Sequence, residues 1–196
     1  MRRRLPVAER RELIVEAAGR LFGKGGYDGT RLDDIAAAAG VTKPILYRHF
    51  DSKRALYLAL LARHRDDLPT FADATPIEGS DRERLGAVLE AWLTYVERHA
   101  YAWRMLFRDQ GGGPEIDAFR RDVQDRAREV LIDMIRWLGD SRIPEVELEP
   151  LAELMRSGMA SLVLWWLDNP GTPRAAVLDA MTRVWAGLLA SGAGTA

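Results

Sequence analysis

The sequence predicts an all-α fold, with an N-terminal three-helix head over residues 1–56 and a C-terminal helical body over residues 57–196. Apolar residues recur at helical spacing along most of the chain, and no segment alternates as a β-strand would. Residues 32–50 form two short helical patterns separated by a glycine, which indicates a helix-turn-helix. A chain of 196 residues that is 47% hydrophobic, with six Trp, can bury a substantial core.

The head begins with an amphipathic helix over residues 8–22, which the glycine-rich stretch 23–26 ends. A second helix runs over residues 32–39. We expect the Thr30 side chain to accept a hydrogen bond from a free N–H group at the start of this helix. Gly40 supplies the positive φ that ends it.

A third short helix starts at Lys43 and is predicted to be capped by Thr42. Pro44 fits its first turn, where no N–H partner is needed. On a helical wheel Lys43, Pro44, Tyr47 and Arg48 share one side, while Leu46 and Phe50 fall on the other. We therefore expect one side of this helix to pack and the other to face outward.

The body is predicted to consist of further helices separated by Pro- and Gly-rich breaks, including a loop over residues 68–80. The expected helices are 54–65, 81–109 with a break near residue 100, 115–138, 151–167 and 174–189.

Charge is divided unevenly along the chain. Residues 1–56 contain 12 Lys and Arg against 7 Asp and Glu, a net charge of +5, and the remaining residues carry −6. Clustered cations attract phosphate backbones and release counterions on binding, so a basic head on an acidic body indicates nucleic acid as the partner. The helix-turn-helix specifies double-stranded DNA. A solvated charge run is the alternative explanation.

The exposed side of the third helix is the candidate DNA-reading surface. Lys43 can contact guanine acceptors in the major groove, and Tyr47 can contact a phosphate oxygen, with Arg48 on the same side. The backbone at Thr42 and Lys43 adds a helix N-terminus that favours phosphate. Arg31 and Lys53 flank this surface, and we assign both to phosphate contacts.

This segment closely resembles the TetR family of bacterial transcriptional regulators over roughly residues 8–60. The matching motifs are Tyr27 and Thr30, Ile35-Ala36, Ala39-Gly40-Val41-Thr42, and Leu46-Tyr47-Arg48-His49-Phe50 with Ser52-Lys53. The resemblance implies that DNA is contacted by Thr42, Lys43, Pro44, Tyr47, His49 and Lys53. The wheel places His49 on the packed side, where a structural histidine is the common outcome.

Two positions depart from the family's pattern. Arg31 stands where the family usually has a small hydroxyl residue, and Pro44 stands where many members have Gly. Both substitutions would alter the preferred operator sequence without abolishing binding. Residues 2–4, all Arg, are candidates for minor-groove or backbone contacts.

The resemblance also implies that the C-terminal helices form a homodimer, and the sequence independently agrees. Small residues near 158–161 permit close helix approach, and the neighbouring Leu and Trp residues cover more than one side of their helix. Two such helices from each subunit can pair across a two-fold axis and require an inverted-repeat operator. The predicted interface residues are Gly158, Ser161, Leu162, Trp165, Leu178, Met181 and Trp185.

An effector pocket is a further implication of the resemblance, and large adaptable side chains on the middle helices suit an apolar cavity. The candidates are Trp92, Tyr95, Trp103, Phe107, Met134, Met155 and Met159. The expected effector is small and apolar or aromatic. Aromatic residues at helical spacing are also ordinary core residues, so both interpretations stay open.

The prediction is therefore a cytoplasmic, sequence-specific transcription regulator, acting as a repressor that a small effector releases. The alternative is a helical-bundle ligand carrier or an enzyme with an incidental basic head. No Cys is present, none of the three His follows a Glu at the Glu-x-x-His spacing, and the glycine runs follow helices rather than strands. We expect no catalytic residues, metal or cofactor. No secretory signal or membrane-spanning stretch is evident.

Overall fold

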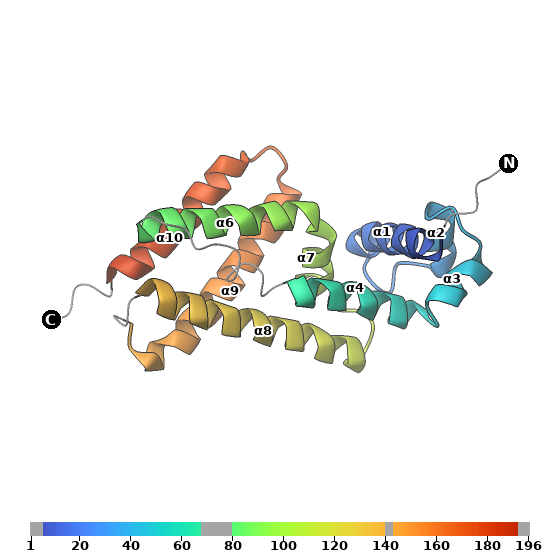
Figure 1. Cartoon of the computed structure of the whole chain (residues 1–196), viewed down its shortest axis with the longest axis horizontal. Helices are drawn as coiled ribbons and strands as arrows, with labels where there is room; N and C mark the ends of the chain where they lie inside the picture. The colour runs from blue at the N-terminus through green and yellow to red at the C-terminus, as the bar shows by residue number, and fades with distance from the viewer. Residues whose placement is uncertain (1–5, 68–79, 140–142, 192–196) are drawn as a thin grey trace. The chain divides into compact units, whose positions relative to one another are not determined.

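The computed structural model describes residues 6–67, 80–139 and 143–191, and these residues form helices only (Figure 1). The predictions for residues 2–4 and most of the 68–80 loop lie outside the described residues. The helices are α1 (Val7–Gly25), α2 (Leu32–Ala38), α3 (Lys43–His49), α4 (Lys53–Asp67), α6 (Asp81–Arg98), α7 (Ala100–Phe107), α8 (Pro114–Gly139), α9 (Glu145–Asp168) and α10 (Arg174–Ser191). The all-α prediction is confirmed. Among the described residues, none of the helices combines the length and apolar content that crossing a membrane requires.

The helices divide into two compact units. The N-terminal unit contains residues 1–66 and 100–122, and the C-terminal unit contains residues 67–99 and 123–196. Helix α7 and the start of α8 therefore pack with the head, whereas the sequence prediction divided the chain at a single point after residue 56. The physical reason is that α7 has its own apolar face, with Met105 fully buried.

The N-terminal unit is held together by the apolar faces of α1, α2, α3 and α4. Ile14, Phe22, Ile35 and Leu46 are almost fully buried, as the helical periodicity predicted. Gly40 ends α2 with a φ of 65°, which confirms its predicted role, because this left-handed conformation strains any residue with a Cβ.

Both predicted hydroxyl caps in this unit are wrong. The N-cap of α2 is Arg31, and the Thr30 side chain is buried, where its hydroxyl lies 2.8 Å from the carbonyl oxygen of Gly26 as a donor. Thr42 occupies the N-cap position of α3, but its side chain makes no capping hydrogen bond. Thr30 does not cap α2 because its hydroxyl bonds the Gly26 carbonyl oxygen in the α1–α2 connection instead. The sequence pattern does not reveal that this acceptor lies within reach.

The C-terminal unit has a core that α6, α8, α9 and α10 all supply. Its fully buried members include Leu89, Ile135 and Trp185, with Met155 also buried among them. A capping box starts α6, in which the Ser80 hydroxyl accepts from the Glu83 N–H and the Glu83 carboxylate accepts from the Ser80 N–H.

Helix α9 begins six residues earlier than the sequence predicted, at Glu145 instead of residue 151. Pro150 lies inside the helix, where it lacks the N–H that would otherwise bond the carbonyl oxygen four residues earlier. Acidic residues Glu145 and Glu147 in the first turn suit the helix dipole and support this early start.

Candidate nucleic-acid interface

Helix α3 packs along one side and is open along the other, as the wheel predicted. Leu46 is fully buried and Phe50 nearly so, while Lys43, Pro44, Tyr47 and Arg48 are exposed. Tyr47 is 45% exposed, a large fraction for an aromatic side chain in a small helical unit. We call these four exposed residues the reading face. Cationic, hydroxyl and apolar groups are thus presented together on an α-helix, an element that the width of a major groove admits.

Asp33 of α2 is paired with the reading face. Its Oδ1 atom lies 2.8 Å from the Nζ atom of Lys43, and Arg31 reaches the same carboxylate at 3.9 Å. The hydrogen bond from Lys43 lowers the pKa of Asp33, and the same bond raises the pKa of Lys43. Lys43 is therefore charged and locally oriented before it meets any partner.

Lys53, the first residue of α4, lies within a set of contacts inside its own unit. Its Nζ atom donates to the carbonyl oxygen of Thr30 at 2.9 Å and lies 4.3 Å from the centre of the Tyr27 ring. These contacts join the start of α4 to the segment that precedes α2. The predicted phosphate contact of Lys53 stays a prediction, as do those of Arg31 and Thr42, both of which are exposed. His49 is only half-buried.

A buried charged network in the N-terminal unit was not anticipated from the sequence. The Asp109 Oδ2 atom accepts from the Tyr57 hydroxyl at 2.7 Å and from the Tyr27 backbone N–H at 2.6 Å, and it lies 3.2 Å from an Arg120 guanidinium nitrogen. Arg120 also donates to the Tyr57 hydroxyl and to the Met105 carbonyl oxygen. Burial raises the pKa of Tyr57, so its hydroxyl keeps its proton.

This network fixes α4, α7, the start of α8 and the α1–α2 connection to one another within the N-terminal unit. One sequence signal was available. Arg120 occupies the α8 position between Ile116 and Val123 on an otherwise buried stripe, and a charge on such a stripe requires a buried partner.

The predicted effector-binding residues fall in both units. Trp103 and Phe107 belong to α7 in the N-terminal unit, where their rings stack with centroids 5.1 Å apart. The rest belong to the C-terminal unit. Met155 is part of its core, the partly buried side chains packed on that core include Trp92, Met134 and Met159, and Tyr95 lies against the ring of His99.

The predicted dimer-interface residues differ in exposure. Gly158, Ser161 and Trp165 are exposed on one side of α9, with Trp165 51% exposed. Leu162 and Leu178 are half-buried, and Met181 and Trp185 are buried in the core of their own subunit. Sequence reasoning missed Leu154 and Val184, which are 67% and 59% exposed.

The exposed apolar residues border a groove between α9 and α10. Its volume is about 470 Å³, and it is lined by Leu154, Met155, Gly158, Met159, Leu162, Ala180, Met181, Val184 and Trp185. We call the exposed residues Leu154, Gly158, Ser161, Trp165 and Val184 the apolar face of α9 and α10. An exposed apolar surface of this kind marks an interaction site.

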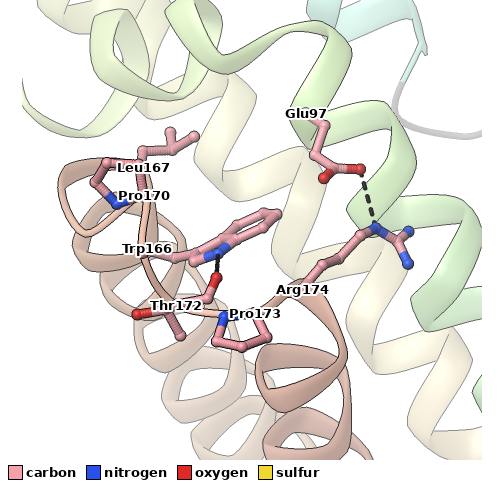
Figure 2. A pocket seen from close by; sticks show the side chains of 8 residues that line it. Glu97, Trp166, Leu167, Pro170, Thr172, Pro173 and Arg174 are labelled. Atoms are coloured by element: carbon pink, nitrogen blue, oxygen red, sulfur yellow. Dashed lines mark hydrogen bonds and ion pairs between the residues drawn. The ribbon is translucent and has the colours of Figure 1, made fainter.

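A hydrogen bond and ion pairs hold the turn between α9 and α10, and they fix the two helices that carry this face (Figure 2). The Trp166 indole N–H donates to the Thr172 carbonyl oxygen at 3.1 Å, and Arg174 pairs with Glu97 of α6 at 3.0 Å. Arg174 also reaches Glu90 at 2.7 Å. A second pocket lies beside this turn, but two of its polar side chains, Glu97 and Arg174, are already paired with each other.

A three-helix head with an exposed cationic third helix, followed by a helical unit, defines a helix-turn-helix DNA-binding protein. The chain belongs to the TetR family of transcriptional regulators. Residues 14–60 match the family described as bacterial regulatory proteins, tetR family, and residues 82–187 match the tetracyclin repressor-like C-terminal domain.

Similar proteins agree with this assignment. The chain is 33% identical to the HTH-type transcriptional activator FasR of Mycolicibacterium smegmatis over 189 residues, covering 94% of this chain and 85% of FasR. Over 47 residues, 24% of this chain, it is 49% identical to the negative regulator IcaR of Staphylococcus aureus, covering 25% of IcaR. A TetR-like regulator from Rhodococcus sp. RHA1 is 30% identical with a TM-score of 0.75, and covers 98% of this chain and all of its own. A tetR-family regulator from Streptomyces coelicolor is also 30% identical with a TM-score of 0.74, over 96% of this chain and 84% of its own. The protein is thus a DNA-binding transcriptional regulator.

Proposed function

We propose that two copies of this chain form a homodimer whose reading faces occupy the two half-sites of an inverted-repeat operator. The carrying observation is the exposed side of α3, with Tyr47 45% exposed beside a pre-oriented Lys43. Half-sites read by a symmetric dimer lie about 34–36 Å apart, or a multiple of that distance. Arg31, Thr42, Pro44, Arg48, His49 and Lys53 add the flanking contacts.

The apolar face of α9 and α10 supports a second copy as its occupant. Leu154, Trp165 and Val184 are each more than half exposed, and a two-fold axis would place identical faces against each other. The small residues Gly158 and Ser161 on the same face permit close helix approach. Dimerisation brings two reading faces to one DNA site, which is what an inverted repeat requires.

We infer that operator occupancy represses transcription and that a small apolar or aromatic effector releases it. The candidate effector residues on α6 to α9 are large and adaptable, and most are partly buried rather than sealed. An effector acts by favouring a body shape whose head spacing no longer matches the DNA. The proposed activity needs no catalysis, metal or cofactor and operates in the cytoplasm.

Helix α4 is the proposed lever for this change. The hydroxyl of Tyr57 in α4 donates a hydrogen bond to Asp109, two residues after α7, and Lys53 at the start of α4 donates one to the carbonyl oxygen of Thr30. A displacement of α7 would therefore be transmitted through α4 to the start of α2 by these packed and hydrogen-bonded groups.

Selection of genomic DNA fragments by the purified protein tests this proposal. We expect an inverted repeat to be recovered, and we expect Lys43→Ala and Tyr47→Ala each to weaken operator binding by roughly 1–3 kcal/mol where the side chain touches a base. Unchanged affinity in a folded double variant would refute the reading-face assignment. A reporter placed behind the selected operator tests repression, because transcription that falls on deletion of the regulator would show activation instead. A carrier or enzyme with an incidental basic head would show no linear fall of log affinity with log salt.

A further inference from the structure

A basic pocket lies between α1 and α7 in the N-terminal unit, outside the reading face. Its volume is about 360 Å³, and it is lined by Arg20, Gly23, Lys24, Tyr101, Arg104 and Arg108. Four of these six residues are cationic and none is acidic. Such a concentration of one charge in a hollow attracts anions more strongly than the same charges on a flat surface.

The four cations reach the pocket through regular helix geometry. Arg20 and Lys24 are four residues apart on one side of α1, Arg104 lies in the last turn of α7, and Arg108 directly follows that helix. Like charges at this spacing destabilise a helix, and a bound anion relieves that cost.

The floor of the pocket is rigid. A Cβ at Gly23 would lie 2.6 Å from the Tyr101 Cβ, so only glycine lets α7 approach α1 this closely. The Tyr101 hydroxyl lies 3.0 Å from the Nε2 atom of His64, which is 2% exposed and fixes the ring from the far side. A rigid floor reduces the conformational entropy lost on binding.

The pocket is distant from the end of α1 that lies near α3. Near the start of α1, the guanidinium of Arg11 lies 4.8 Å from the ring centre of Phe50, which directly follows α3. Lys24 is about 20 Å farther along the same helix, at a rise of about 1.5 Å per residue. A ligand in the pocket therefore does not compete with bases at the reading face.

We propose that this pocket binds a small molecule carrying a diphosphate or a comparable cluster of negative charges. Guanidinium forks match phosphate oxygens in pairs, and Lys24 adds a point charge at the end of α1. The lining cations come from two helices that face each other across the pocket, which suits a ligand that carries two or more negative charges.

Titration calorimetry with inorganic pyrophosphate as the probe, in buffer free of divalent cations, tests this site. The test variant is Arg20→Gln/Lys24→Gln, since both side chains are exposed and their loss leaves the core intact. The matched control is Arg126→Gln/Arg128→Gln, which removes two cations from α8 in the C-terminal unit. We expect saturable binding to the wild type and the control, and binding weaker by about tenfold or more in the test variant. An Arg104→Gln variant with a wild-type unfolding curve should also lose affinity.

Two outcomes overturn the proposal. One is evidence of general charge attraction. It would be seen if pyrophosphate gave no more heat than sodium chloride of equal ionic strength, or if pyrophosphate binding weakened equally in both double variants. The other is that the test variant loses operator affinity without pyrophosphate while the control does not, which assigns these cations to the DNA backbone. Neither outcome bears on the reading face, which the Lys43 and Tyr47 variants test separately.

Discussion

Lys43 and Asp33 form an ion pair with 2.8 Å between Nζ and Oδ1, so the central cation of the reading face is partnered by an acid from the preceding helix. Each partner is about half exposed, so the pair contributes little to folding. Its expected consequence is for DNA binding, because Asp33 lies beside the surface that we propose contacts the DNA polyanion. On this proposal, DNA either shares Lys43 with Asp33 or displaces Asp33 from it.

Asp33→Asn should therefore raise affinity for random duplex DNA and steepen the fall of log affinity with log salt by about one unit, since it removes one opposing charge. Filter binding or fluorescence anisotropy at several salt concentrations measures both quantities. Asp133→Asn is the control, because Asp133 of α8 pairs with Arg136 in the same way outside the N-terminal unit. Equal slopes in wild type and Asp33→Asn would contradict the prediction.

Asp109→Ala should destabilise the protein by roughly 3 kcal/mol, because it leaves the buried Arg120 without its main counter-charge. The side chains of Asp109 and Arg120 are only 10% and 6% exposed. Tyr57→Phe should cost about 1 kcal/mol, the value of the hydrogen bonds that one buried hydroxyl makes. Urea unfolding measures both effects. Glu129→Ala, at an exposed pair, should cost less than about 0.5 kcal/mol, and a similar small effect for Asp109→Ala would show that the network is not stabilising.

Trp165→Glu should convert the dimer to a monomer, because it places a charge in the proposed contact between two apolar faces. Sedimentation equilibrium measures the mass in solution. Trp137→Glu is a matched control, since Trp137 is 52% exposed against 51% for Trp165 but lies on α8, beneath the guanidinium of Arg84. If Trp165→Glu stays dimeric, or if both variants dissociate equally, the apolar face of α9 and α10 is not the interface.

Two glycine-to-alanine substitutions should have opposite effects. Gly23→Ala should destabilise by about 1–3 kcal/mol, because its new Cβ would lie 2.6 Å from Tyr101 Cβ and 2.9 Å from Tyr101 Cα. Gly86→Ala, inside α6 with nothing within 4 Å of the new Cβ, should stabilise by up to about 1 kcal/mol through helix propensity. Thermal unfolding followed by circular dichroism compares them, and a shift of the same sign in both would be inconsistent with this packing.

The Glu153–Arg156 pair should make a small contribution to stability that depends on pH. Hydrogen bonds from Arg156 lower the pKa of Glu153 to about 2 from 4.5. The folded protein thus binds this proton less readily than the unfolded chain, so the stabilisation is present above pH 4.5 and is lost as pH falls toward 2. Glu153→Gln should lower the free energy of unfolding by at most about 0.5 kcal/mol at pH 7, and the difference should shrink between pH 4.5 and about pH 3. A difference constant over this range would exclude the linkage.

The sequence by itself determined the helical class, the break at Gly40 and the side of α3 that faces outward. Helical periodicity and a residue that tolerates positive φ are local properties, so a few neighbouring residues encode them. The same reasoning located Trp165 on an exposed face of α9.

Only the tertiary structure decided which groups meet across long stretches of chain. Periodicity marks an apolar side without saying what covers it, so Trp185 appeared equivalent to Trp165 although it is fully buried in its own subunit. The hydroxyl of Thr30 donates a hydrogen bond to the Gly26 carbonyl oxygen instead of capping a helix N-terminus. The carboxylate of Asp109 accepts a hydrogen bond from Tyr57 and forms an ion pair with Arg120. Such pairings depend on how whole helices pack, because burial forces each polar group to a partner that is near in space and distant in sequence.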